Sequence, residues 1–302
     1  MANLRRILDS AVEQFSPETK RLHFLPESRY NKNIFPTTGQ YDWFSGQVLY
    51  FLVRYLRPVR IIEVSTSSGY SSLFSALALK ANEFGRLETF ELLPEIASAA
   101  WANFERFGVQ DYVRLHVGDA REKAHAVVAE RNQKREKEIL FLDSEHTEEF
   151  ARFFLDTFLP DTHPESLFHM HDVLPPNANV MYRPLEVLSD ASFRTRGRIY
   201  YLLKRMVPSL APPDLRSWVK PETFNPKEWT SEGSFAHKLA TDIPSEEQIY
   251  IHNLIGKYPV LNGRSYDTHS IWRCDSRGRP MEWNESWWCI CGALESAYRV
   301  CS

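Results

Sequence analysis

The stretch Ile61–Gly69 reads IIEVSTSSG and carries the strongest fold signal in the chain. An apolar run contains one acid, Glu63, and is followed by small residues, among them Ser65, Ser67 and Gly69 at every second position. A helical sequence, YSSLFSALALK, begins directly afterwards. Small side chains let a ligand approach the backbone, and the first turn of a helix presents unpaired N–H groups to it. This order of strand, loop and helix predicts the ligand-binding turn of an open α/β sheet.

Downstream of this turn, short apolar runs alternate with helical stretches. The strands that we predict are Arg60–Val64, Leu87–Phe90, Val113–Val117, Glu138–Leu142 and Ser166–His171. The predicted helices between them are Ser71–Glu83, Pro94–Phe107 and Thr147–Thr157. The alternation predicts an α/β fold with a doubly wound, mostly parallel Rossmann-like sheet and helices on both faces.

Composition and charge narrow the class of protein. The 302 residues are 43% hydrophobic and 25% charged, with a formal net charge of -3, so electrostatics give no reason to expect nucleic acid or an acidic membrane as a main partner. The first residues, MANLRRILDSAVEQF, contain no apolar run long enough for a signal peptide or a spanning helix. We therefore expect a cytoplasmic protein with no nucleic acid and no membrane partner.

We expect three regions along the chain: an N-terminal helical segment (1–56), an α/β core (57–175) and a long C-terminal extension (176–302). The extension is rich in aromatic residues, which favours a folded structure. We expect it to be either a lid that covers the substrate or a homodimer interface. Within it, Thr268–Asp275 and Ser286–Cys291 are predicted to pair as strands and to complete the sheet. Four cysteines lie near the C-terminus without the spacing of a zinc site: Cys274, Cys289, Cys291 and Cys301.

The small-residue loop resembles motif I of the class I S-adenosylmethionine-dependent methyltransferases, which reads acid-x-Gly-x-Gly-x-Gly. The match runs through Glu63, Ser65, Ser67 and Gly69, with serine in place of two glycines. Serine adds a Cβ where the family brings its cofactor close to the backbone. A nicotinamide-dependent oxidoreductase would instead carry G-x-G-x-x-G, so the spacing disfavours this alternative.

Acids also follow the next strands. Glu91 comes about 20 residues beyond the loop. An acid at this separation in the sequence is placed to accept hydrogen bonds from both ribose hydroxyls of a nucleoside cofactor. Gly118-Asp119-Ala120 looks like the adenine-binding position of the family, with Asp119 accepting from the exocyclic amine and Ala120 offering its backbone N–H. The resemblance implies that the following residues bind S-adenosylmethionine: Glu63, Ser65, Ser67, Gly69, Glu91, Asp119, Ala120 and Asp143.

The ends of the fourth and fifth strands, FLDSEHTEEF and FHMHDV, are similar to those of small-molecule O-methyltransferases. Some members of this group hold a divalent metal there, so Asp143 and Asp172 are candidate ligands of Mg²⁺, which would lower the pKa of an acceptor hydroxyl. His146 and His171 are candidate bases for removing the hydroxyl proton, with Asp143 as a further catalytic candidate. A metal-free transferase that relies on His146 is the main rival to the metal-assisted one.

Together these features lead us to expect an S-adenosylmethionine-dependent methyltransferase. The expected acceptor is a hydroxyl of a small molecule, such as a natural product, a sugar or a phenol-like compound. Acceptors with nitrogen or carbon nucleophiles stay open, because removal of a proton by His146 would serve them too. A non-catalytic protein of the same fold, which binds the cofactor within an assembly, is the alternative outside the enzyme class.

Overall fold

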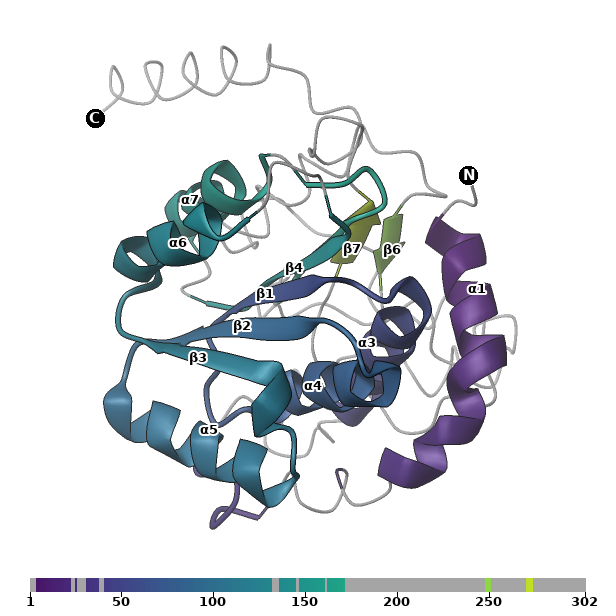
Figure 1. Ribbon diagram of the computed structural model, residues 1–302, viewed down its shortest axis with the longest axis horizontal. Coiled ribbons are helices and arrows are strands. Elements are labelled where there is room, and N and C mark those ends of the chain that lie inside the picture. The colour runs from purple at the N-terminus through teal and green to yellow at the C-terminus, as the bar shows by residue number, and fades with distance from the viewer. Residues whose placement is uncertain are drawn as a thin grey trace, which may run out of the picture.

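The computed structural model describes residues 4–22, 25, 31–37, 41–131, 136–144, 147–160, 162–171, 248–250 and 270–273. Within these ranges the chain forms one sheet of seven strands in the order β3-β2-β1-β4-β5-β7-β6 (Figure 1). Strands β1 to β5 are parallel to one another, whereas β7 runs antiparallel to both β5 and β6. The predicted α/β fold with a mostly parallel sheet is confirmed.

The strands span Arg60–Val64 (β1), Arg86–Glu91 (β2), Val113–Val117 (β3), Glu138–Leu142 (β4), Leu167–Met170 (β5), Gln248–Tyr250 (β6) and Ser270–Arg273 (β7). Three of the five predicted parallel strands have the predicted bounds, and β2 and β5 differ from the prediction by one residue at each end. The predicted strand Thr268–Asp275 contains β7, which does complete the sheet. Its partner on the far side is β6, a strand that we did not predict, and Ser286–Cys291 lies outside the described residues.

The helices span Leu4–Phe15 (α1), Trp43–Leu56 (α3), Tyr70–Asn82 (α4), Pro94–Arg106 (α5), Ala120–Ala129 (α6) and Glu148–Phe158 (α7), with short 3-10 turns at Ser16–Leu22 (η1) and Gln110–Tyr112 (η2). Helix α6 is not among the predicted helices. It begins after Asp119, whose carboxylate accepts a hydrogen bond from the N–H of Arg121 at 2.8 Å and so caps the helix. No helix in the described part of the chain is long and apolar enough to cross a membrane.

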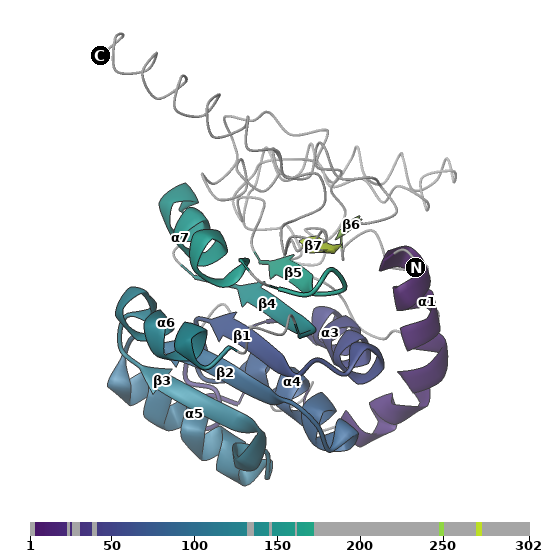
Figure 2. The same cartoon turned by 45° about the horizontal axis from the view of Figure 1, so that its top comes forward.

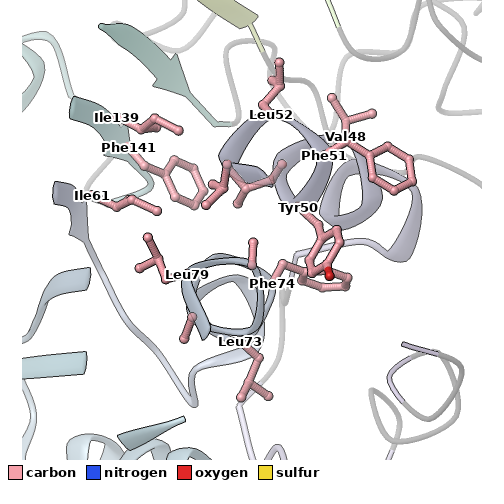
Figure 3. Close-up of a cluster of buried hydrophobic side chains, with 14 of the residues drawn as sticks. Val48, Tyr50, Phe51, Leu52, Ile61, Leu73, Phe74, Leu79, Ile139 and Phe141 are labelled. Atoms are coloured by element: carbon pink, nitrogen blue, oxygen red, sulfur yellow. The ribbon is translucent and has the colours of Figure 1, made fainter. Parts of the chain in front are cut away.

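Two hydrophobic cores fill the two faces of the sheet. Helices α3, α4 and α5 cover one face, and α6 and α7 cover the other (Figure 2). Side chains alternate along a buried strand, so Ile61 of β1 belongs to the first core and Ile62 to the second. Figure 3 shows Ile61, Ile139 and Phe141 of the sheet facing α3 and α4 across the first core.

The N-terminal helical segment belongs to that same first core. Apolar residues of α1 are buried together with those of α3 and α4. An ion pair holds η1 against α3, because Glu18 accepts hydrogen bonds from the Nε of Arg54 at 2.8 Å and from the Tyr50 hydroxyl at 2.6 Å. The helices of residues 1–56 are therefore packed as part of the α/β unit, not beside it.

The contact between α3 and α4 depends on a residue without a side chain. A Cβ atom placed on Gly46 would lie 2.3 Å from the ring of Phe74, which is fully buried. We expect Gly46→Ala to lower the free energy of unfolding by about 1 to 3 kcal/mol, because overpacking outweighs the gain of about 1 kcal/mol in helix propensity. Urea unfolding would measure this, and Phe74→Leu in the same chain should recover part of the loss. Unchanged stability of Gly46→Ala would contradict the packing described.

Candidate active site

The loop between β1 and α4 adopts an unusual backbone conformation. Ser65, Ser67 and Gly69 have φ angles of 77°, 50° and 86°, all in the left-handed region. This region costs a residue with a Cβ about 1 to 2 kcal/mol, and glycine adopts it freely. The loop therefore has a backbone that glycine would favour at all three positions, although serine occupies two of them. The three predicted loop residues lie together at the carboxyl end of β1.

Glu63 lies beneath this loop. Its side chain is 0% exposed, and one carboxylate oxygen accepts from the hydroxyl of Ser71 at 2.6 Å. The other oxygen accepts from the hydroxyls of Thr89, at 2.8 Å, and Ser72. Glu63 thus fastens the start of α4 to β1 and β2, and its direct contact with a cofactor stays a prediction.

Glu91 lies beside the loop, at the end of β2. Its carboxylate accepts hydrogen bonds from the N–H of Ser67 at 2.8 Å and from the N–H of Leu93 at 3.0 Å. The structure therefore brings together Glu91 and the loop residues, as their positions at the ends of neighbouring parallel strands require. Ribose binding by Glu91 fits this place.

Asp119 and Ala120 follow β3 at the same edge of the sheet. Asp119 caps α6, and its side chain is 39% exposed, so its carboxylate is accessible from solvent. Ala120 is the first residue of α6, where backbone N–H groups have no partner within the helix. Both features suit the predicted adenine-binding role.

Asp143 and His171 form a pair across the ends of β4 and β5. The Nδ1 atom of His171 lies 2.9 Å from Oδ1 of Asp143. Backbone hydrogen bonds extend the sheet to both residues: the N–H of Asp143 donates to Val64 at 3.2 Å, and the N–H of His171 donates to Leu142 at 2.9 Å. The His171 side chain is 2% exposed and that of Asp143 is 21% exposed. A carboxylate beside an imidazole can orient the ring and stabilise its protonated form.

Aromatic rings surround this pair on the side of α3. Tyr41, just before α3, lies with its ring centroid 5.7 Å from that of His171. The ring of His169 stacks on Phe141 at 4.4 Å, and both are buried. The Tyr41 ring limits the positions available to the His171 ring, and no sequence pattern indicated this contact.

The other catalytic and metal predictions cannot be placed. His146 and Asp172 lie outside the described residues. Among the residues that the structure does describe, no three histidine, cysteine, aspartate or glutamate side chains gather as a metal site would require.

One contact at the loop was missed in the sequence. The hydroxyl of Thr37 lies 2.8 Å from the hydroxyl of Ser67 and 2.7 Å from that of Ser68. The only signal was indirect, since Pro36-Thr37 belongs to the turn-forming stretch PTTG that precedes α3.

Comparison with known proteins agrees with this geometry. Residues 62–173 match a family model described as a methyltransferase domain. Over these residues the chain is similar to a methyltransferase domain, and the strand order and the loop conformation agree with this similarity.

Two curated relatives are catechol O-methyltransferases, one from Niastella koreensis and one from Mycobacterium tuberculosis. Each is 36% identical over 75 residues, which are 25% of this chain and 33% of the relative. The chain thus matches about a third of the length of these relatives. A solved structure from Staphylococcus aureus, assigned as a caffeoyl-CoA O-methyltransferase, is similar over 85% of this chain and 98% of its own, with a TM-score of 0.51 and 14% identity. This likeness supports the fold.

The buried Glu63 should make stability depend on pH. Burial raises its pKa to about 7 from the ordinary value of 4.5, against the lowering effect of the hydroxyls of Ser71, Ser72 and Thr89, and the charge of Asp143 adds to the rise. The stability that the protonated carboxyl contributes is full below pH 4.5 and is lost as the pH rises through about 7. We expect Glu63→Gln to remove this loss, so that the variant gains on the order of 3 kcal/mol relative to the wild type between pH 5 and 8.

Urea unfolding of both proteins at several pH values would measure the difference. Glu122→Gln, at an exposed position of α6, is the matched control and should leave the pH profile of the wild type unchanged. A parallel pH dependence in wild type and Glu63→Gln would show that Glu63 does not titrate in this range.

Proposed function

We propose that the protein is an S-adenosylmethionine-dependent methyltransferase that methylates a hydroxyl of a small molecule. The observation that carries the proposal is the loop Ser65 to Gly69, with three left-handed residues and the Glu91 carboxylate bonded to the N–H of Ser67. The names of the curated relatives, catechol O-methyltransferases, support a phenol-like acceptor among the hydroxyl compounds expected from the sequence.

The cofactor would lie along the carboxyl edge of the sheet. The loop offers its backbone to the methionine part, Glu91 accepts from the ribose hydroxyls, and Asp119 and Ala120 hold the adenine. Each of these groups follows a different parallel strand, so one extended ligand can reach all of them. A nicotinamide cofactor fits less well, because its pyrophosphate is bound by the G-x-G-x-x-G turn that this loop lacks.

The chemistry needs a group that removes a proton. The bound cofactor would supply a sulfonium methyl group, which is transferred by in-line attack of the acceptor oxygen. His171, whose Nδ1 lies 2.9 Å from Oδ1 of Asp143, can take the hydroxyl proton as the oxygen attacks. His146, three residues beyond Asp143 in the sequence, is the other candidate base.

Assistance by Mg²⁺ is the second form of the proposal. Asp143 and Asp172 would hold the ion, which would polarise the acceptor hydroxyl. The described donors at this place are one carboxylate and one imidazole, a set that suits a hard cation poorly because Mg²⁺ prefers oxygen ligands. The proposed proton transfer therefore uses only His171 and Asp143.

Calorimetric titration tests the cofactor. We expect S-adenosylmethionine and S-adenosylhomocysteine to bind with micromolar dissociation constants, and NAD not to bind. Glu91→Ala should raise the dissociation constants of S-adenosylmethionine and S-adenosylhomocysteine about tenfold, since it removes two charge-assisted hydrogen bonds to ribose. Glu95→Ala, at an exposed position in the first turn of α5, is the control. Binding of NAD alone would favour the oxidoreductase, and an unchanged affinity of Glu91→Ala would move the ribose site elsewhere.

Turnover with a catechol acceptor tests the base. We expect His171→Asn to lower kcat by ~100-fold, because general-base assistance is lost, while the affinity for S-adenosylhomocysteine stays within about twofold. His125→Asn, on the exposed side of α6, should behave as the wild type. Near-normal turnover of His171→Asn together with inactive His146→Ala would transfer the role to His146.

Removal of metal ions with a chelator distinguishes the metal-free from the metal-assisted transferase. Full activity after treatment with EDTA supports proton removal by the histidine alone. Loss of activity that Mg²⁺ or Mn²⁺ restores supports the cation form.

Cofactor binding without methylation of any hydroxyl, nitrogen or carbon acceptor would favour the non-catalytic partner. A dimer in sedimentation would support the homodimer interface.

A further inference from the structure

The segment that precedes α3 reaches back to the cofactor loop. Thr37 stands 30 residues before Ser67 in the sequence, yet its hydroxyl lies within 2.8 Å of the hydroxyls of both Ser67 and Ser68. These distances are those of hydroxyl–hydroxyl hydrogen bonds. Thr37 therefore bonds to the loop itself, whereas Glu63 bonds to the start of α4 and to β2 on either side of it.

A buried amide makes a second link between the same segments. The Nδ2 group of Asn103, on α5, donates to the carbonyl of Ile34 at 2.7 Å and to the carbonyl of Ser68 at 2.8 Å. Asn103 is 2% exposed, so the loss of either bond would leave a buried polar group without that partner. Helix α5, the loop and residues 31–37 are thereby joined at one point.

The segment also touches the residue that follows the loop. Tyr70, the first residue of α4, donates its hydroxyl to the carbonyl of Leu25 at 3.1 Å. Its ring meets the ring of Phe35 edge to face, with the centroids 5.1 Å apart. The N-terminal residues thus hold the loop and the helix start together.

These contacts bear on a strained conformation. Serine rarely adopts the left-handed backbone that Ser65 and Ser67 have, and such a conformation persists only where the surroundings fix it. Glycine at position 67 would adopt it freely but could not bond to Thr37. The serine hydroxyl and the threonine hydroxyl are therefore complementary halves of one contact.

We propose that Thr37 is a positioning residue for cofactor binding. It holds Ser67 and Ser68 so that the loop backbone is already in its binding conformation before the cofactor arrives, which reduces the ordering that binding requires. This inference rests on the proposed function, because it assigns Thr37 to the same cofactor site. Thr37 acts through the loop and needs no contact with the reacting atoms.

Thr37→Val tests the contact, since it removes the hydroxyl and keeps the shape. We expect the dissociation constant for S-adenosylhomocysteine to rise about five- to tenfold, because the hydrogen bonds to Ser67 and Ser68 are lost. The KM for S-adenosylmethionine should rise by the same factor while kcat changes little, and Thr37→Ser should restore both. A purely structural role would lower stability without this division between KM and kcat.

Thr162→Val is the matched control. The Thr162 hydroxyl is buried and donates to the carbonyl of Leu159 at 2.9 Å, before the start of β5 and away from the loop. This variant should lose stability in urea unfolding and bind S-adenosylhomocysteine as the wild type does. Ser68→Ala removes one of the same bonds from the loop side, so it should weaken binding like Thr37→Val and add little when combined with it.

The outcomes separate this inference from the proposed function. Failure of the wild type to bind S-adenosylhomocysteine overturns both. Tight binding by the wild type, with unchanged affinity in Thr37→Val, overturns the role of Thr37 and leaves the cofactor assignment standing. If Thr37→Val does not fold, Ser68→Ala decides alone, and its unchanged affinity overturns the inference.

Discussion

A buried carboxylate determines how the functional end of this domain is built. Glu63 is out of contact with water, and its two oxygens are satisfied by hydroxyls from α4 and β2. The hydroxyl of Thr89 also lies 2.6 Å from that of Thr66, within the loop. A polar group at this depth is costly unless it is hydrogen-bonded, so the strand, the helix start and the neighbouring strand have little freedom to move apart. The two ends between which the loop runs, β1 and the start of α4, are therefore held at a fixed separation.

Hydrogen bonds to the loop and to the end of β1 hold the neighbouring residues in place along the carboxyl edge of the sheet. Glu91 bonds to the loop at Ser67, and Asp143 continues β4 by donating to Val64, the last residue of β1. His171 continues β5 in the same way. Parallel strands place their carboxyl ends side by side, so residues that are far apart in the sequence reach one edge without any long connection. The His171–Asp143 pair exists because these extensions keep both residues in register.

Strands and helices that depend on a local residue pattern could be predicted from the sequence. Contacts between segments that are far apart in the chain could not. Strands β1 and β4 are mainly apolar and buried along their whole length, and their bounds were predicted correctly. Helix α6 buries few residues and β6 has three, so neither has a clear periodicity. The acid at the end of β2 could be located from its position alone. The bond from Thr37 to the loop could not, because it forms only when a segment 30 residues away folds back. His146 and Asp172 stay predictions.

The place of β7 has a consequence for the synthesis of the chain. Met170 of β5 pairs with Ser270 of β7, a hundred residues later. At about 5 to 20 residues per second, the ribosome needs roughly 5 to 20 s to make the intervening chain. During this time β5 has an open edge, which can pair with the wrong strand. A nascent chain of this protein therefore exposes the edge of β5 to wrong pairing until β7 has emerged from the ribosome.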